Sequence, residues 1–550
     1  MTRRIHRPAR VTALVGGVVL AALMPMIAAN GAPRVTDPSC DTARRAVTYT
    51  TSTSAVPHAT GTSALMPCLQ RVSKSTQAGE THLAITSAGT IVYQAQNVLG
   101  DGNQNAEGQA PVQLALTSDG GHSWSGTGLN VSQAMSGPSG IDNTLYRDPG
   151  TDRLFWVIYG NGSQEINTML GRSDDGGHTW TVGAIPCCAN GENPRLLAAP
   201  PRTSTTQGYK DVLYYCTNTS QVGGLVFFAG DRICYKSLDG GNTWAGPSIM
   251  LQKPAGHFPE CGGLGEQFDS LDGSYPTADA AGRVYLLIRC GVETESFLGP
   301  QPSSAYVLRS DDEMSTWTKV GDAPALPPGY GVMGSAYKEE MRSDADGNLY
   351  LLAGTQAPTY AMYLWTSTDH GATWNAARNI TIPGTVLAAS PMWQMAVSAP
   401  GHLMVDYTGT TTAPPCASSS TGCDNLNMYV TQSSDALAAD ATYDGAAVNT
   451  AKDHTAYYFP GGDFTDIVTG PAGQARASFP HGYVGWLEAA DTASPPPAHH
   501  PKRAPVKTPV VREPVGMLAA TGLPGALSTA ALLVLVGALV VTRSRRRHHA

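Results

Sequence analysis

Alternating apolar and polar residues around short, glycine-containing turns recur along the central part of the chain. Each occurrence has a run of large apolar residues on either side of the turn, as in HLAITSAGTIVYQA and RSDADGNLYLL. Period-two alternation interrupted by a tight turn is typical of a β-hairpin. The pattern predicts hairpins at 82–95, 145–159, 277–288, 342–352, 396–407 and 466–479, with a looser form at 195–216.

A second repeat, an octet ending in tryptophan, follows most of these hairpins after a further apolar run. Four copies are nearly complete: TSDGGHSW at 117–124, SDDGGHTW at 173–180, SLDGGNTW at 237–244 and STDHGATW at 367–374. SDDEMSTW at 310–317 lacks the glycine, and SSDALA is a sixth, degenerate copy. The central aspartates are Asp119, Asp175, Asp239, Asp312, Asp369 and Asp435.

Two hairpins in each unit give four strands, and the unit repeats at intervals of about 65 residues, as repeat architectures do. Four-stranded units arranged radially form a β-propeller. Six octets predict an all-β fold of six four-stranded antiparallel blades. The extra hairpin at 466–479 fits closure of the ring, in which the last strands complete the first blade, and a seventh blade is the alternative.

The octet itself has the composition of a structural turn. Asp and Ser or Thr side chains accept hydrogen bonds from turn amides, and glycine supplies a positive φ. A tryptophan offers a large flat surface that can wedge between neighbouring blades. We therefore predict an architectural role for the octet tryptophans, which are Trp124, Trp180, Trp244, Trp317 and Trp374.

These octets resemble the Asp box, S-x-D-x-G-x-T-W, of the sialidase superfamily, and the resemblance covers about residues 80–490. It implies a propeller whose boxes lie at the periphery, away from the substrate pocket. In that family three arginines bind the substrate carboxylate, one of them in an early FRIP-like motif. A tyrosine nucleophile is assisted by a glutamate, and an aspartate is the acid/base. Here the FRIP position reads GETHL, with Glu80 near the expected arginine.

The first hairpin strand of each unit should lie innermost, so residues at its start are the candidates for a ligand site. They include four carboxylates, two aromatic residues and an arginine: Glu80, Asp142, Arg195, Tyr275, Glu192, Trp393 and Asp466. The segment YKEEMR adds Glu339, Glu340 and Arg342, which we expect to carry any catalysis. Alternation places Glu340 and Arg342 on one face of a strand, where an acid could act as general acid or base. A structural ion pair is the alternative.

Three functions fit this arrangement of carboxylates and aromatic residues. The first is an exo-glycosidase of sialidase type acting on sialic acid or another sugar. Sialic acid is anionic, and a site rich in carboxylates would repel it. The second is a non-catalytic propeller that binds a glycan or a protein, and the third is a scaffold without chemistry. The sequence has no GxSxG, HExxH or phosphate-loop motif, so we expect no metal or other cofactor, and we expect a monomer.

Both ends of the chain have the composition of processing segments. Residues 1–31 combine four arginines, an apolar run and small residues, which predicts a signal peptide. Residues 32–79 are assigned to an N-terminal extension, 80–490 to the propeller, 491–516 to a Pro-rich linker and 517–550 to an anchoring segment.

The last segment contains LAATG, an apolar run at 523–541 and an arginine-rich tail. This order resembles a cell-wall sorting signal of the LAxTG type found in actinobacteria. The resemblance implies cleavage after Thr521 by a sortase and covalent attachment to peptidoglycan. A plain C-terminal membrane anchor is the alternative, and either one predicts an extracellular, wall- or membrane-anchored protein.

Charge and cysteine content indicate which partners and cross-links are expected. Without residues 1–31 and those after Thr521, the chain has 27 basic and 43 acidic residues, which disfavours nucleic acid. Ten cysteines in an exported chain without a CxxC pair indicate disulfides rather than zinc. We expect the pairs Cys40–Cys68, Cys261–Cys290 and Cys416–Cys423, with Cys187 and Cys188 paired to Cys216 and Cys234.

Overall fold

The structure is a computed structural model, and strands are the regular elements of the part that it describes. The described residues are 38–53, 56–72, 81–96, 112–127, 143–158, 168–186, 191–219, 232–251, 276–290, 304–324, 339–355, 359–388, 392–411, 426–450, 465–470, 473–480 and 482–489. The chain divides into two units, 1–493 and 494–550, and all described residues belong to the first.

Five antiparallel sheets have four strands each, ordered along the chain. The first two contain β5 (His82–Ile85), β6 (Ile91–Gln96), β7 (Val112–Thr117) and β8 (Ser125–Gly126), then β9 (Thr144–Arg147), β10 (Leu154–Ile158), β11 (Thr168–Ser173) and β12 (Thr181–Ile185). The third contains β13 (Gly191–Ala199), β14 (Val212–Thr219), β15 (Arg232–Ser237) and β16 (Ala245–Leu251). The fourth and fifth contain β17 (Thr277–Ala278), β18 (Val284–Cys290), β19 (Ser304–Ser310) and β20 (Thr318–Asp322), then β21 (Glu339–Ser343), β22 (Leu349–Gly354), β23 (Met362–Ser367) and β24 (Arg378–Asn379).

Two larger sheets complete the set. The sixth is built on β26 (Trp393–Ala399), β27 (His402–Thr410), β28 (Asn427–Ser433) and β29 (Ala441–Ala447), and is extended by β25 (Val386–Leu387), β2 (Val47–Thr51) and β3 (His58–Thr62). The seventh has the order β30 (Asp466–Thr469), β31 (Ala475–Phe479), β32 (Tyr483–Ala489), β4 (Leu65–Arg71) and β1 (Ser39–Cys40).

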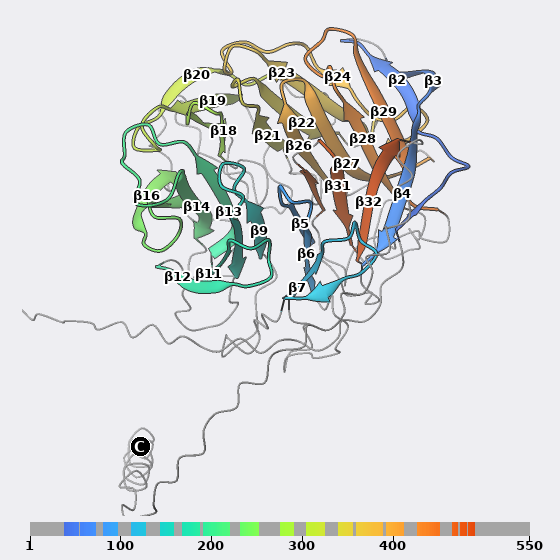
Figure 1. Cartoon of the computed structure of the whole chain (residues 1–550). Helices are drawn as coiled ribbons and strands as arrows, with labels where there is room; N and C mark the ends of the chain where they lie inside the picture. Colours follow the sequence, from blue (N-terminus) through green and yellow to red (C-terminus); the bar gives the residue numbers. More distant parts are fainter. Residues whose placement is uncertain are drawn as a thin grey trace, which may run out of the picture. The chain divides into compact units, whose positions relative to one another are not determined.

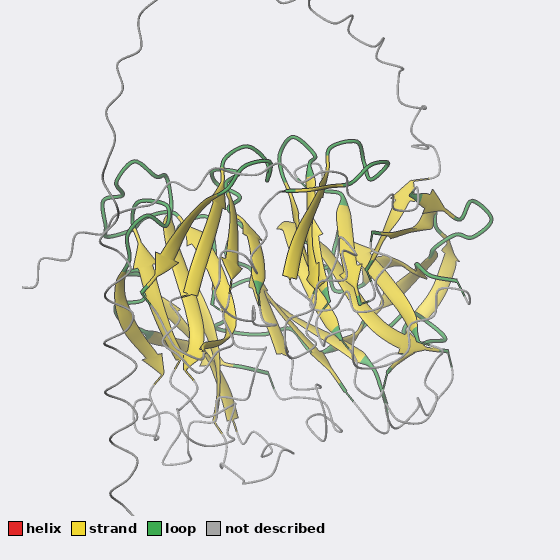
Figure 2. Ribbon diagram, turned by 90° about the horizontal axis from the view of Figure 1, so that it is seen from below, coloured by secondary structure: helices red, strands yellow, loops and turns green. Residues whose placement is uncertain are grey.

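The innermost strands of these sheets form a closed series around one axis. β5 contacts β9, and the contacts continue through β13, β17, β21, β26 and β30 back to β5. Figure 1 shows β5, β9, β21 and β26 near the centre, and β16, β20 and β3 at the rim. Figure 2, turned by 90° from Figure 1, shows the strands of the sheets in yellow. The fold is therefore a β-propeller, as predicted.

The six octet-bearing four-stranded units are confirmed, each forming one blade. The hairpin at 466–479 does not complete one of these blades. It forms a seventh sheet with β32 and β4, between the sixth blade and the first, which is the alternative that the sequence left open.

The segment assigned to an N-terminal extension belongs to the propeller. β4 pairs with β32 from Leu65↔Ala489 to Arg71↔Tyr483, and β2 pairs with β29 of the sixth sheet. The strands β1 to β4 thus belong to the last two sheets, whose other strands are distant from them in sequence.

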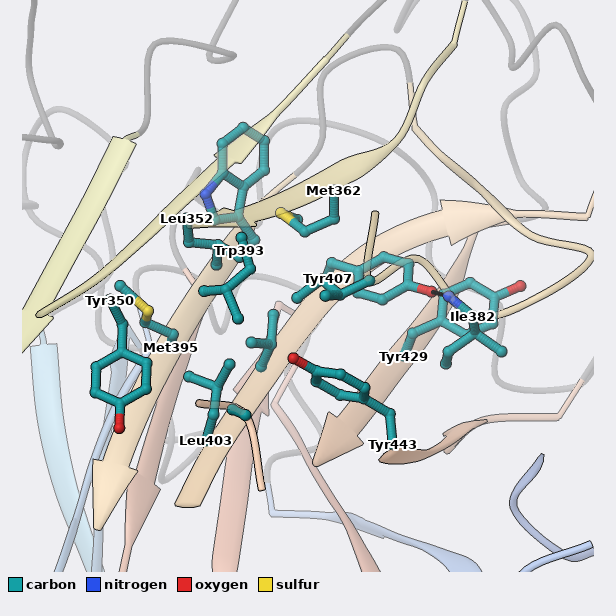
Figure 3. Close-up of a cluster of buried hydrophobic side chains, with 14 of the residues drawn as sticks. Tyr350, Leu352, Met362, Ile382, Trp393, Met395, Leu403, Tyr407, Tyr429 and Tyr443 are labelled. Carbon is teal, nitrogen blue, oxygen red and sulfur yellow. Dashed lines mark hydrogen bonds between the residues drawn. The ribbon is translucent and has the colours of Figure 1, made fainter. Parts of the chain in front are cut away.

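Blade packing explains why many strands are apolar on both faces. All five residues of β10 are buried, and alternate side chains enter different clusters. Leu154, Trp156 and Ile158 pack with Val92 of the first blade, whereas Phe155 and Val157 pack with Leu213 of the third blade. The largest cluster joins the fifth and sixth blades, and Figure 3 shows Tyr350, Met362, Trp393 and Tyr407 within it.

The octets have the structural role that their composition predicted. In the second blade, Asp175 Oδ1 accepts the amide of Thr179 (2.8 Å), Oδ2 accepts its hydroxyl (2.5 Å), and Ser173 Oγ accepts the amide of Gly177 (2.8 Å). Gly177 has φ +92°, and a Cβ there would lie 2.9 Å from Val92 of the first blade. Trp180 packs with Val92 and Leu114 of that blade, so it lies between two blades.

The same hydrogen bonds recur in the octets of Asp119, Asp239, Asp312 and Asp369. Trp124 is buried, and Trp244, Trp317 and Trp374 are partly buried against core clusters. The degenerate copy at Asp435 keeps the bond from Ser433 Oγ to Asp435 Oδ1 (2.9 Å).

Two disulfides lie within the described residues. Cys40–Cys68 is confirmed, and it joins directly opposed residues of β1 and β4. Pairing of Cys216 and Cys234 with the vicinal cysteines is wrong, because these two residues face each other on β14 and β15 and bond together. Cys187, Cys188, Cys261, Cys416 and Cys423 lie outside the described residues, and the side chain of Cys290 is not described.

The signal peptide, the Pro-rich linker and the anchoring segment remain predictions from the sequence. Residues 1–31, 491–516 and 517–550, including Thr521, lie outside the described ranges. Within the ranges that are described, no helix has the length and hydrophobicity needed to cross a membrane.

Candidate functional site

Charged side chains from four neighbouring or facing blades meet around the propeller axis, at the end where the inner strands begin. We call Arg195, Glu340, Arg342, Asp406 and Asp466 the axial cluster. They come from β13, β21, β27 and β30. Arg342, Asp466 and Arg195 all influence the ionisation of Glu340, and Glu340 and Asp466 influence that of Asp406.

Glu340 is buried and uses both of its carboxylate oxygens. Oε2 accepts the amide of Met395 on the adjacent inner strand β26 (2.6 Å), and Oε1 forms an ion pair with Arg342. The Arg342 Nε in turn donates to the carbonyl of Met395 (3.5 Å). The pair therefore satisfies the open edge of β26, and its side chains join the fifth and sixth blades.

Asp466 has the corresponding role two junctions further around the ring, between β30 and β5. Its Oδ2 accepts the amide of Leu83 on β5 (3.0 Å) and lies 3.4 Å from Nδ1 of His82. Because an inner strand has no further strand to pair with, its edge amides need side-chain acceptors. An acid at the start of the preceding inner strand supplies one.

Neutral side chains act similarly at two other junctions. Thr277 Oγ1 on β17 accepts the amide of Ser343 on β21 (3.0 Å). Thr144 Oγ1 on β9 donates to the carbonyl of Pro194 on β13 (2.8 Å) and accepts from Arg195 (3.1 Å). Polar residues at the starts of inner strands thus hold adjacent blades together.

Exposure separates the members of the axial cluster into two groups. The side chain of Arg342 is 31% exposed and that of Asp466 is 17% exposed, and Arg195 is partly exposed. Glu340 and Asp406 are more deeply buried, with side-chain exposure of 7% for Glu340 and complete burial for Asp406. A ligand at the axis would therefore meet the arginines and Asp466 first.

The two buried acids have raised pKa values. Burial raises the pKa of Glu340, Arg342 and the Met395 amide oppose that effect, and the charge of Asp466 adds to it. Burial also holds the pKa of Asp406 well above its usual range, in opposition to Thr465 and the Gln394 amide, and Asp466 and Glu340 reinforce the increase. Such carboxyl groups can retain a proton where exposed ones cannot.

The predicted site residues divide into three sets. Arg195, Glu340, Arg342 and Asp466 are brought together. Glu339 and Glu192 lie on β21 and β13, but their side chains are not described, and Glu80, Asp142 and Tyr275 lie outside the described residues. Trp393 is 1% exposed and packs in the core between two blades, near Gly354, so its indole is unsuited to stack on a sugar (Figure 3).

Sequence reasoning missed Asp406 and the contribution of His82. Asp406 lies on the second strand of its blade, and only the first strands were considered as sources of site residues. A signal was present, since this carboxylate stands within the otherwise apolar run HLMVDY. Arg147, at the far end of β9, donates to Asp152 (2.6 Å) and takes no part in the cluster.

One grouping among the described residues has the residue types of a metal site. Cys40, Cys68 and Glu488 lie close together. The two sulfurs form a disulfide and are therefore not thiolate ligands, so the grouping does not fit a metal ion.

Comparison with known proteins adds nothing to the class of protein that the strand topology defines. No protein-family model and no curated protein matches the chain. An α-L-arabinofuranosidase from Fusarium graminearum is similar over 68% of this chain and 93% of its own, with 13% identity and a TM-score of 0.36. NanB sialidase from Streptococcus pneumoniae is similar over 76% and 70%, with 14% identity and a TM-score of 0.35.

A lectin from Aleuria aurantia is similar over 65% of this chain and 92% of its own, with 12% identity and a TM-score of 0.35. Scores and identities this low add nothing to what the sheets themselves show. The molecule is a β-propeller with peripheral Asp-box turns and a charged cluster at its axis.

Proposed function

We propose that the chain is an exported, surface-anchored propeller that binds a carbohydrate at the axial cluster. The observation that carries the proposal is the convergence of two guanidinium groups and three carboxyl groups from different blades at one end of the axis. Charged donors and acceptors set side by side suit the hydroxyl groups of a sugar, and few convergent polar groups are needed to orient a small ligand.

The exposed members would make the contacts, and the buried ones would position them. Arg342 and Arg195 donate hydrogen bonds, and Asp466 accepts them. Glu340 holds the guanidinium of Arg342 in place, so it is a positioning residue unless the ligand displaces Arg342. The protein, rather than the ligand, thus sets the geometry of the donors.

Binding can be tested on a glycan array with the purified full-length protein. We expect specific binding to one group of glycans, and its loss in Arg342→Met. Lys319→Met is a matched control, because Lys319 pairs with Asp322 on the outer strand β20. Failure of the wild type to bind any glycan would remove the proposal and leave a protein-binding propeller or a scaffold.

Glycoside hydrolysis is a second candidate, favoured by the raised pKa of the buried acids. An acid that keeps its proton near neutral pH can donate it to a leaving group. A panel of fluorogenic glycosides tests this directly. Among the described residues the cluster has two arginines, whereas the resemblance to sialidases implies three, so we expect a neutral sugar to be preferred over a sialoside. Absence of turnover with continued binding would favour a non-catalytic, lectin-like role.

Anchoring is the part of the proposal that rests on LAATG and the segments around it. We expect muramidase to release the mature protein from its native host with a peptidoglycan fragment on Thr521, and detergent to leave it in place. Thr521→Ala should move it to the membrane or the medium. Quantitative extraction of the wild type by detergent would favour a plain membrane anchor.

A further inference from the structure

Asp406 is the most deeply buried charged group of the axial cluster. Its exposed fraction is 0%, and it lies opposite Gln394 in the pairing of β27 with β26. Oδ1 accepts the amide of Gln394 (2.7 Å). Among the described residues, Oδ2 makes no hydrogen bond of normal geometry, although the hydroxyl of Thr465 lies near enough to lower the pKa of Asp406.

The groups that face Asp406 come from three elements. Asp466 on β30, with Thr465 just before it, and Glu340 on β21 affect its ionisation, and Gln394 on β26 supplies the amide. Two of these neighbours are carboxylates. An ionised Asp406 would therefore be a third negative charge in a buried place, which is costly.

The amides of two successive residues connect this carboxyl to the rest of the cluster. Gln394 donates to Asp406, and the next residue, Met395, donates to Glu340, whose partner is Arg342. Successive amides of a strand point to opposite edges. β26 is therefore held between a carboxyl of its own blade and a carboxyl of the preceding blade.

We propose that Asp406 is a positioning residue whose proton keeps β26 in place between the two carboxyl groups, and that loss of this proton at alkaline pH loosens the strand and opens the binding site. The effect on ligands rests on the proposed function, but the effect on β26 does not. Deprotonation places a third charge beside Asp466 and Glu340. The resulting repulsion acts on the strand whose amide and carbonyl fix Glu340 and Arg342.

The test uses full-length protein without ligand. Infrared spectroscopy follows the protonated carboxyl band, and hydrogen exchange follows residues 393–399, both from neutral to alkaline pH. We expect a band in the wild type at neutral pH that disappears as exchange of β26 rises beyond the intrinsic pH effect. Asp406→Asn, which stays neutral and retains an acceptor for Gln394, should lose that part of the band and the alkaline rise in exchange.

Asp211→Asn is the matched control. Asp211 is also buried, and burial together with the neighbouring Asp148 raises its pKa, but it lies in the turn region between the second and third blades. This variant should lose a different part of the band and keep the alkaline rise in exchange of β26. Equal alkaline rises in the wild type and Asp406→Asn would overturn the proposal.

If Asp406→Asn does not fold, the double variant Asp211→Asn, Glu340→Gln decides the question, because Asp406 is then the one carboxyl group among the described residues whose pKa is raised. A protonated carboxyl band that persists at neutral pH and is lost together with protection of β26 supports the proposal, and absence of that band contradicts it. Glycan-array binding at both pH values adds the functional arm. A loss of binding without any change in β26 would reject this inference and leave the proposed function standing.

Discussion

The carboxylates at the periphery of the propeller and those at its axis differ in what surrounds them. Asp175 is exposed and accepts two bonds from Thr179 and one from Ser173. Burial alone would raise its pKa, but these bonds outweigh burial and lower it, and the other intact octets behave alike. Glu340 and Asp406 are buried, and burial, with a smaller effect of the nearby Asp466, raises their pKa values. The periphery is thus built for ionised acids, whereas the axis holds acids that resist ionisation.

The peripheral carboxylates should therefore contribute mainly to stability, and the axial carboxyl groups mainly to function. A carboxylate stabilised in its charged form contributes to folding at neutral pH. A carboxyl group forced toward its neutral form costs free energy there, and such groups gather at functional sites. Substitutions at the two regions should therefore have opposite consequences.

The largest expected effect is at the periphery. Trp180→Ala should lower the free energy of unfolding by about 3–5 kcal/mol, because the indole fills the space between the first and second blades. Chemical denaturation measures the change. Trp317→Ala is the matched control, and its partly exposed side chain should give a smaller loss. A Trp180→Ala protein of wild-type stability that had lost ligand binding would break the comparison.

At the axis the main effect should be on binding. Arg342→Met should weaken carbohydrate binding by about 10- to 100-fold, since a charged hydrogen bond contributes roughly 1.5–3 kcal/mol. The protein should remain folded, because Glu340 keeps the Met395 amide and can take up a proton when its partner is gone. Titration calorimetry with an array-selected glycan measures the effect. Glu340→Gln, which also keeps an acceptor for that amide, should weaken binding less.

The degenerate octet at 310–317 is a peripheral turn in which Glu313 and Met314 stand where other copies have glycines. Glu313 and Met314 take the positive φ values of +59° and +66° that glycines adopt in the intact copies. The Glu313 carboxylate accepts the amides of Arg202, Thr203 and Ser204 (2.9 Å each) and pairs with Lys236 (3.0 Å), all in the neighbouring blade.

A glycine at position 313, as at Gly120, Gly176 and Gly240 of three intact copies, should therefore destabilise the protein. Glu313→Gly relieves an unfavourable φ but leaves three amides and an ammonium group without their acceptor, and we expect a net loss of about 1–3 kcal/mol in the free energy of unfolding. Burial is outweighed by these bonds, so the pKa of Glu313 lies far below normal. Its contribution is present above the unfolded pKa of about 4.3 and lost as pH falls through the folded value. A more stable Glu313→Gly protein at neutral pH would show that strain dominates.

The smallest effect is expected for a single intact octet. Asp175→Asn keeps an acceptor but loses the charge, so the free energy of unfolding should fall by about 1 kcal/mol at neutral pH. Because the folded pKa of Asp175 is lowered, this difference should shrink as pH falls through that pKa.

Asp406→Asn should change the pH dependence of stability in the opposite direction. The raised pKa of Asp406 makes the wild type lose stability as pH rises above about 3.9, and the variant removes that loss. Parallel pH profiles for the two variants would contradict the assignment.

The sequence revealed the features whose interactions are local. Every octet bond joins residues within a few positions, so composition and spacing predicted the turns and the blades. Arg195, Glu340, Arg342 and Asp466 could be predicted because a propeller places the starts of its inner strands together.

Pairing across the chain was beyond the same reasoning. β4 pairs with β32, which lies more than 400 residues later in the chain. The β4 sequence LMPCLQR forms no hairpin with a neighbouring strand, so the seventh sheet could not be assigned from the sequence. Cys216 and Cys234 were assigned to other partners because their register depends on the pairing of β14 with β15. Asp406 was missed because its role depends on burial against a neighbouring blade.

The most direct test of the division between periphery and axis measures stability and carbohydrate binding together, on Asp175→Asn and Arg342→Met in the full-length protein. We expect Asp175→Asn to unfold more easily but to bind like the wild type, and Arg342→Met to lose binding far beyond any change in stability. Loss of binding in folded Asp175→Asn, with wild-type binding in Arg342→Met, would contradict it.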